Sequence, residues 1–212
     1  MIPGVSAEEA SGRGKVYGVL ALAFYPPGAN SEHVWKDMTR LLEALHPGEV
    51  THGKEVTFSA LGFRNLEHEY NRLFVGPGHV ACPPYESVYL GDGHGGEKGL
   101  VLGPSSVDVR TAYREAGLGL DKGFTDLPDH IAVELEFMKY LCDRESDESV
   151  KGEPAWGSRQ AKFIRSHLGR WTPPFADSVT KNTTSPFYLT AARLLTEFVA
   201  EEAGNLPPEA GK

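Results

Sequence analysis

Apolar side chains recur along most of the chain at the spacing of one helix face. The clearest stripe predicts a helix over about residues 30–45 and consists of Val34, Met38, Leu41, Leu42 and Leu45. The same spacing predicts further helices over residues 7–25, 65–75, 105–116, 127–142, 156–168 and from 186 towards the C-terminus. No strand-like alternation extends beyond Glu86–Leu90. The sequence therefore predicts an all-α fold of about seven or eight helices.

Proline and glycine set several of the predicted helix ends. Pro26-Pro27-Gly28 ends the first helix, and Gly76-Pro77-Gly78 ends the third. Gly12 and Gly14 weaken the first helix near its start, because glycine favours the unfolded chain.

Two further boundaries depend on capping and breaking residues. Residues 126–129 hold a capping aspartate, a proline and a second acid, and this composition predicts a helix that starts at Leu127. On that helix Asp129 falls on the solvated face, whereas His130 and Glu134 fall on a half-buried face. The Trp171-Thr-Pro-Pro segment predicts that the preceding helix closes by residue 168.

The length of 212 residues fits one domain with a proper hydrophobic core. We expect a single helical domain over residues 1–205. A glycine-rich loop is inserted in it at residues 91–103, and residues 206–212 form a flexible tail.

Charge and composition narrow the functional classes. The net charge of −8 argues against a nucleic-acid partner, which needs a basic surface, and favours basic partners. The apolar run from Val16 to Tyr25 spans about ten residues, which are too few to cross a bilayer, so no stable membrane insertion is expected. Cys82 and Cys142 form no disulfide framework or metal motif. We therefore expect a cytoplasmic protein.

Two motifs that could signal chemistry lack the context that would support them. Gly91 to Gly96 matches G-x-G-x-x-G, but no helix opens at the third glycine, so a flexible loop is the simpler interpretation. No G-x-S-x-G elbow is present, and Cys82 has no activating neighbours. The sequence therefore indicates no catalytic residue and no enzyme activity, and no cofactor is expected.

His130 and Glu134 stand four residues apart, a spacing that can place two metal ligands on one turn of a helix. Two ligands do not make a site, and His68 would join them only through packing that the sequence does not reveal. The alternative to a structural or groove-lining pair is thus a helical metal-binding or small-molecule enzyme that uses His130, Glu134 and His68.

The loop from Pro83 to Tyr89 has a distinctive composition. Pro83 and Pro84 fix backbone angles and remove two amide donors, so the segment is stiff and extended, with free carbonyl groups. Tyr85 and Tyr89 offer flat, amphipathic contact area. Such a loop beside an apolar helix face suits peptide binding. Equally, Pro84 and Tyr85 could simply fill the helical core.

Five short motifs occur in order and cover nearly the whole chain. They are Tyr17–Phe24 with Pro26-Pro27, Tyr70-x-Arg72-Leu73-Phe74-x-Gly76-Pro77, Pro83-Pro84-Tyr85-x-Ser87-Val88-Tyr89, Pro128-Asp129-His130-Ile131 with Glu134-Leu135, and Ser185-Pro186-Phe187-Tyr188. This series resembles the TorD/DmsD/NarJ family of cytoplasmic chaperones, which mature molybdenum-containing redox enzymes. Tyr70 and Tyr85 stand where the DmsD branch has tryptophan, and the glycine-rich insertion after Leu90 is a further departure.

The resemblance implies an all-helical fold and a dedicated chaperone rather than an enzyme. Its implied partner is the apo-form catalytic subunit of a molybdoenzyme, bound through its twin-arginine signal peptide and held until the cofactor is inserted. The peptide-binding residues that the resemblance implies are Tyr70, Leu73, Pro84, Tyr85, Asp129 and His130. We add Phe74, which would bury the apolar part of the peptide, and Glu134, which would attract its arginines together with Asp129. Such a chaperone is expected to be a monomer or a dimer.

Overall fold

The computed structural model describes residues 6–48, 60–77, 80–90, 101, 103–119, 127–147 and 156–206. These residues form helices and no strand, which confirms the predicted all-α fold. In chain order the helices are α1 (Ala7–Phe24), α2 (Ser31–Leu45), α3 (Ala60–Tyr70), the π-helical turn η1 (Asn71–Val75), α4 (Glu86–Leu90), α5 (Pro104–Glu115), α6 (Ile131–Ser146), α7 (Trp156–Phe163), the π-helical turn η3 (Ile164–Leu168), α8 (Gly169–Asn182) and α9 (Pro186–Gly204).

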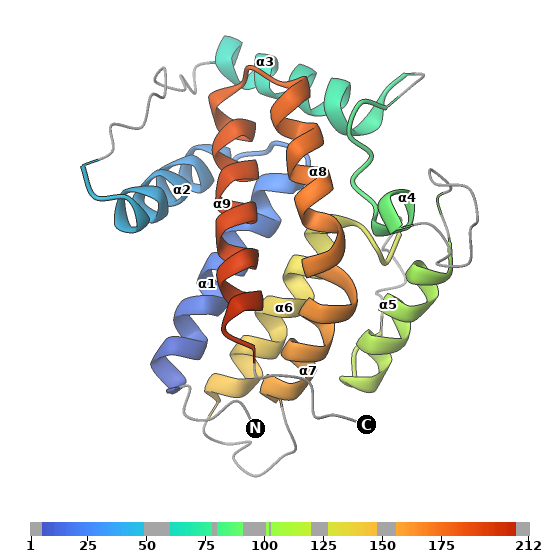
Figure 1. Cartoon of the computed structure of the whole chain (residues 1–212). Helices are drawn as coiled ribbons and strands as arrows, with labels where there is room; N and C mark the ends of the chain where they lie inside the picture. The colour runs from blue at the N-terminus through green and yellow to red at the C-terminus, as the bar shows by residue number, and fades with distance from the viewer. Residues whose placement is uncertain are drawn as a thin grey trace.

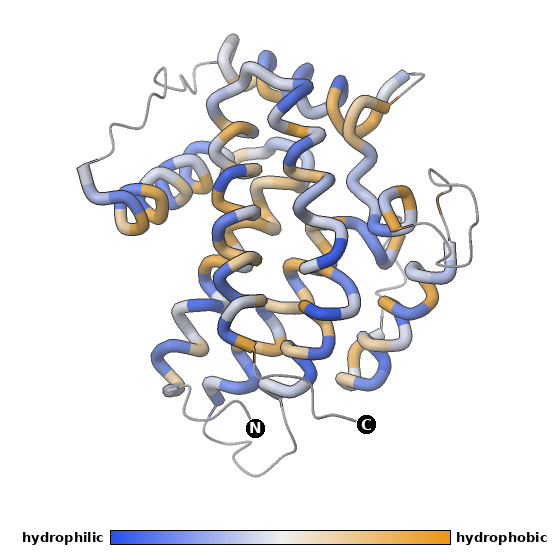
Figure 2. The backbone as a smooth tube through the Cα atoms, viewed as in Figure 1, coloured by the Kyte–Doolittle hydropathy of each residue, from blue (hydrophilic) through white to orange (hydrophobic). Residues whose placement is uncertain are grey.

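Helices α1, α6, α8 and α9 form the central bundle, and α3 lies across one end of it (Figure 1). Helix α2 projects from the side of the bundle next to α1 and α9, while α4 and α5 lie beside α8. Around each bundle helix, apolar and polar positions alternate (Figure 2). The apolar positions meet in one core, whose largest fully buried side chains include Trp171, Tyr17, Tyr188, Phe24 and Phe175.

Helices α1 and α6 approach each other closely over two glycines. A Cβ added at Gly14 would lie 3.2 Å from the Cβ of Cys142, and one at Gly18 would lie 3.1 Å from Cδ of Lys139. The glycine at position 14, predicted only to weaken α1, therefore also lets the two helices pack. A capping box compensates at the start of α1, where Ser6 Oγ accepts from the amide of Glu9 at 3.1 Å.

The predicted start of α6 at Leu127 is wrong, because α6 begins at Ile131. His130 is its N-cap, and its Nδ1 accepts a hydrogen bond from the Ala132 amide at 3.1 Å. Pro128 and Asp129 form a turn before the helix. The proposed cap Asp126 lies outside the described residues, as do residues 91–100, which hold the G-x-G-x-x-G motif.

The predicted helix end near residue 168 is also wrong, since α7, η3 and α8 form one continuous helical segment. Pro173 and Pro174 lie inside α8, on its exposed side. Two close contacts lie just before these prolines, around the π-helical turn. Thr172 Oγ1 donates to the Leu168 carbonyl at 2.8 Å. Gly169 admits the Ile164 carbonyl, which would lie only 2.8 Å from an added Cβ.

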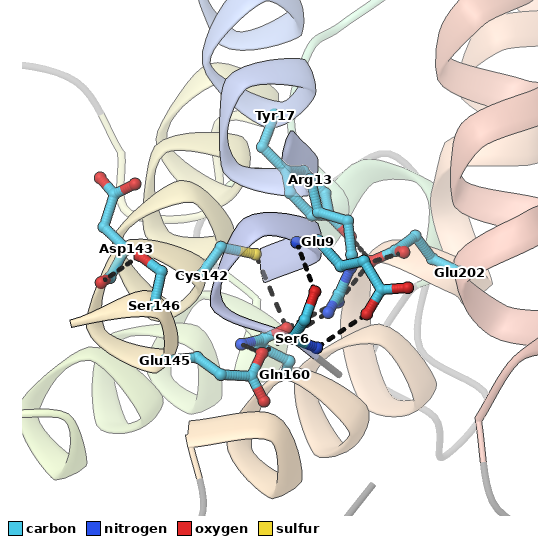
Figure 3. Close-up of polar contacts among 10 residues, drawn as sticks. All are labelled: Ser6, Glu9, Arg13, Tyr17, Cys142, Asp143, Glu145, Ser146, Gln160 and Glu202. Carbon is cyan, nitrogen blue, oxygen red and sulfur yellow. Dashed lines mark hydrogen bonds and ion pairs between the residues drawn. The ribbon is translucent and has the colours of Figure 1, made fainter. Parts of the chain in front are cut away.

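A part-buried polar cluster links α1 to α6, α7 and α9 (Figure 3). Arg13 donates to Glu202 through Nε at 2.8 Å and through Nη2 at 2.6 Å. The same Nη2 reaches Gln160 Oε1 at 2.6 Å, and Tyr17 donates to Glu202 at 2.9 Å. Gln160 in turn donates to Glu145 at 2.9 Å. We call these five residues the Arg13 cluster.

Candidate functional site

The proline loop is hydrogen-bonded to the start of α6. The Pro84 carbonyl accepts from the Ile131 amide at 2.9 Å, and the Glu86 amide donates to the Asp129 carbonyl at 3.0 Å. Tyr85 and His130 thereby form an isolated antiparallel bridge. The structure thus brings together Pro84, Tyr85, Asp129 and His130, four of the predicted peptide-binding residues.

Asp129 is fully buried, so its predicted place on a solvated face is wrong. Its Oδ2 accepts from the Ser87 amide at 3.0 Å, at the N-terminus of the short helix α4. Its Oδ1 has no hydrogen-bond partner among the described residues. The Asp129 carboxylate thus accepts from the Ser87 amide, which has no partner within α4 because it lies in the first turn. This bond holds the proline loop against the start of α6.

His130 lies between two tyrosines that reach the surface. The ring of Tyr25 stacks on it with centroids 6.2 Å apart, and the ring of Tyr85 meets it edge-on at 5.4 Å. His130 is buried, whereas both tyrosines are half-buried. Because Nδ1 accepts from the backbone, the proton of a neutral His130 ring sits on Nε2. Tyr25 also donates to exposed Glu136 at 2.9 Å. We call Tyr25, Tyr85 and His130 the aromatic face.

Two carboxyl groups lie side by side behind this face. Glu134 and Glu86 are 0 % and 1 % exposed and share a hydrogen bond. Trp171 Nε1 donates to Glu134 Oε2 at 3.1 Å, and His167 Nδ1 lies 3.0 Å from Glu86 Oε2. Burial and then repulsion from Glu86 raise the pKa of Glu134 well above its ordinary value. The raised pKa favours the protonated form of Glu134, in which the carboxyl group can donate a hydrogen bond to Glu86.

Tyr70, Leu73 and Phe74 belong to the aromatic core rather than to the aromatic face. The Phe74 ring lies 5.3 Å from that of Tyr70 and 5.5 Å from that of Tyr188. Leu73 is 0 % exposed. The Leu73 carbonyl nevertheless accepts a hydrogen bond from the Cys82 amide at 2.8 Å. This bond attaches η1 to the segment just before the proline loop.

Sequence reasoning missed Tyr25, Glu86 and His167. Glu86 follows Tyr85 directly, but a glutamate in a loop normally indicates a solvated position. His167 is 81 positions further along the chain and meets Glu86 only through packing. Only the position of Tyr25, between the end of the first helix and Pro26-Pro27, could have indicated it as a site residue.

The described residues contain no group of three or more His, Cys, Asp or Glu side chains suited to a metal ion. His68 is exposed on α3, whereas His130 and Glu134 are buried in separate hydrogen bonds. Both cysteines are free and buried. Burial raises the pKa of the Cys82 thiol, and it raises that of Cys142 to about 12, the opposite of what a nucleophile needs.

Among the described helices, none is both long and apolar enough to cross a membrane.

A family model described as nitrate reductase delta subunit matches residues 29–177. The chain belongs to this family. The resemblance to TorD/DmsD/NarJ chaperones is thus confirmed. Among its curated relatives is the chaperone protein TorD of Photobacterium profundum, 31% identical over 144 residues, which are 66% of this chain and 63% of the relative. The chain covers less than two thirds of the length of this TorD protein and of the TorD protein of Vibrio parahaemolyticus, which is 28% identical.

Two further family relatives match over more of their length. The perchlorate reductase assembly chaperone protein of Dechloromonas aromatica is 24% identical over 205 residues, covering 91% of this chain and 88% of the relative. A crystal structure described as a redox enzyme maturation protein, from Archaeoglobus fulgidus, superimposes with a TM-score of 0.54 at 25% identity. That match covers 89% of this chain and 93% of the solved one.

Proposed function

We propose that this chain is a dedicated chaperone for the precursor of a molybdopterin-containing oxidoreductase. It binds the apo-form catalytic subunit in the cytoplasm, through the twin-arginine signal peptide, and holds it until the cofactor is inserted. The names of its relatives, TorD chaperones and a perchlorate reductase assembly chaperone, support this proposal.

The aromatic face is the single observation that carries the peptide-binding part. Tyr25 and Tyr85 present flat, amphipathic area on either side of a buried histidine. Such side chains bind with little loss of conformational freedom and are frequent at the energetic centre of interfaces. The loop that carries Tyr85 is held by backbone hydrogen bonds and by Asp129, so the face is organised before a peptide arrives.

The eight predicted site residues take three roles in this proposal. Tyr85 contacts the peptide, and His130 orients both tyrosines. The other six position the loop from the interior, because their burial leaves little or no surface for a peptide; they are Tyr70, Leu73, Phe74, Pro84, Asp129 and Glu134.

Electrostatics favours a leader that carries arginines. The chain has a net charge of −8, and Glu136 is an exposed carboxylate directly beside Tyr25. Attraction of this kind speeds association and sets the register of a bound segment. Because salt screens exposed charges, binding weakens as salt is added.

No described residue arrangement favours the alternative of a metal-binding or small-molecule enzyme built on His130, Glu134 and His68. The pKa of Glu134 is raised and its Oε2 accepts from Trp171, which disfavours a charged metal ligand, and His130 Nδ1 accepts from a backbone amide.

Fluorescence anisotropy of the full chain tests the proposal. The probe is a fluorescein-labelled synthetic peptide with two adjacent arginines followed by ten residues of leucine and alanine. We expect a micromolar Kd, about −8 kcal/mol, that weakens at least tenfold in Tyr85→Ala. The control Tyr140→Ala removes another half-buried tyrosine, which packs on Trp156, and it should bind normally. Circular dichroism checks that each variant stays helical.

The proposal fails if the wild-type chain does not bind this peptide. The signal-peptide part of the proposal is wrong if the chain binds a precursor that lacks its signal peptide as tightly as it binds the complete precursor.

A further inference from the structure

A polar cavity of about 390 Å³ lies between α4, α5 and the continuous segment of α7, η3 and α8. One wall is a single face of α5, on which lining residues recur three or four positions apart from Ser105 to Glu115. The opposite wall carries Lys162, His167 and Arg170. The volume falls within the range of about 300–1,000 Å³ that is usual for small-molecule sites.

Two deeply buried titratable side chains belong to the walls of this cavity. Glu86 is 1% exposed and His167 is 8% exposed, and His167 Nδ1 lies 3.1 and 3.0 Å from the two carboxyl oxygens of Glu86. The π-helical turn η3 carries His167 to this position. Such turns are rare and are frequent at functional sites. The inner part of the cavity is therefore built from buried polar groups.

Ser105 adds a hydroxyl group that has no partner. The residue is 9% exposed, and its buried Oγ makes no hydrogen bond with another described residue. Burying a hydroxyl group without a hydrogen bond costs free energy, so an unpartnered one calls for an explanation. A ligand in the cavity that Ser105 lines would supply the missing hydrogen bond.

The remaining charged side chains of the cavity form one ion pair and leave two charges over. Lys162 Nζ and Glu115 Oε2 lie 3.4 Å apart and join the two walls. Asp108 and Arg170 are exposed, and neither forms an ion pair with another described residue. The two walls run in opposite directions (Figure 1). Asp108 and Arg170 therefore lie on the same side of the ion pair, each roughly 10–12 Å from it along its own helix.

We propose that this cavity binds a free amino acid through its ammonium and carboxylate groups. The carboxylate lies between the Arg170 guanidinium, whose paired donors match its two oxygens, and the Ser105 hydroxyl group. The ammonium group lies at Asp108. Asp108 would repel a ligand with negative charge alone, and Arg170 would repel one with positive charge alone. A ligand that carries both charges pairs with both residues.

Thermal unfolding of the full chain is measured with each standard L-amino acid at millimolar concentration, because a ligand that binds only the folded state raises the Tm. Isothermal titration calorimetry with the amino acid that gives the largest shift then provides the Kd. Propionate and propylamine carry one of the two charges each and should bind at least tenfold more weakly. If no amino acid raises the Tm or gives a binding signal, the proposal is overturned. Propionate or propylamine that binds as tightly as the amino acid overturns it as well.

Two substitutions test the location. Arg170→Gln and Asp108→Asn should each raise the Kd of the amino acid at least tenfold, because each removes one of the two pairing charges. The matched controls are Arg110→Gln on α5 and Asp177→Asn on α8, both at exposed positions outside the cavity. They make the same changes of net charge and should bind as the wild type does. Equal weakening in a variant and in its control overturns the site.

Ser105→Ala separates a binding role of the hydroxyl group from a structural one. Because this hydroxyl group has no partner, its removal should not lower the free energy of unfolding measured without the amino acid. The affinity for the amino acid should fall several-fold. A less stable variant with unchanged affinity would show that the hydroxyl group serves the fold, and it would contradict the place of Ser105 in the site.

Discussion

Glu134 and Glu86 share one hydrogen bond in the interior, between the start of α6 and the short helix α4. Burial and repulsion from Glu86 raise the pKa of Glu134 well above its ordinary value, which favours the neutral form of its carboxyl group. Trp171 donates a hydrogen bond to Glu134, and His167 is hydrogen-bonded to Glu86. Because Glu86 follows Tyr85 directly in the chain, we expect the attachment of the proline loop to depend on pH.

We predict that the stability contributed by Glu134 falls as pH rises. Its pKa is raised in the folded chain, so above the ordinary carboxyl pKa the folded state binds a proton that the unfolded state has lost. This contribution is fully present below the unfolded pKa and is lost as pH rises through the folded one. The free energy of unfolding, measured in urea from pH 5 to 8, should therefore decline by up to about 1.4 kcal/mol per pH unit relative to Glu134→Gln.

The amide of Glu134→Gln provides the comparison because it donates to Glu86 and accepts from Trp171 at every pH. Glu134→Ala leaves Trp171 Nε1 without its acceptor and Glu86 with only His167, so it should cost about 1–3 kcal/mol more than the amide. Parallel pH profiles for the wild type and Glu134→Gln would show that Glu134 does not hold the proton.

Asp129 should control the mobility of the loop. Removing its carboxylate in Asp129→Ala frees the Ser87 amide and should destabilise the chain by about 0.5–2 kcal/mol. Hydrogen exchange of residues 86–90 should accelerate, and Asp129→Asn, which keeps an acceptor oxygen, should restore much of the protection. Exchange that stays slow in Asp129→Ala would assign the loop's rigidity to its backbone hydrogen bonds alone.

The sequence predicted the helices and helix ends that depend only on neighbouring residues. The stripe of α2 and the stop at Gly76, whose φ is 96°, need only the spacing of neighbours and the permissive backbone of glycine. The predicted start of α6 at Leu127 was wrong for a different reason. Asp129 has the residue type of a helix cap, but it caps α4, which lies 42 positions earlier in the chain.

The candidate site was predictable to the extent that its residues occur together in motifs. Tyr85 and His130 belong to two quoted motifs, and the structure pairs them. The Glu86–Glu134 hydrogen bond depends on two segments meeting in the core, and no local pattern encodes that meeting.

The two glycines near the start of α1 should respond oppositely to alanine. Gly12→Ala meets no atom within 4 Å and reduces the freedom of the unfolded chain, so it should raise stability by about 0.4–1 kcal/mol. Gly14→Ala brings a methyl group to 3.2 Å from the Cβ of Cys142 and must push α6 away, at a cost of about 1–3 kcal/mol. Thermal unfolding measures both, and equal shifts would show that the two helices separate without strain.

The Arg13 cluster should behave as a coupled unit. Glu202 is 7% exposed and accepts from both Arg13 and Tyr17. Glu202→Gln removes the closer of the two carboxylates that pair with the part-buried Arg13 guanidinium and leaves only Glu145, at 3.5 Å. We expect a loss of about 1–3 kcal/mol in urea unfolding, whereas Glu201→Gln, at the exposed neighbouring position, should change stability by less than about 0.5 kcal/mol.

Removing both charges tests whether this loss comes from the pair itself. In Arg13→Met with Glu202→Gln, no buried charge is left unpaired, so the double variant should be more stable than the sum of the single losses predicts, by about 0.5–3 kcal/mol. Additive losses would mean that Arg13 and Glu202 stabilise the chain independently. In that case the contact between α1 and α9 would depend on apolar packing, such as that of Tyr17 against Phe198, whose ring centroids lie 4.8 Å apart.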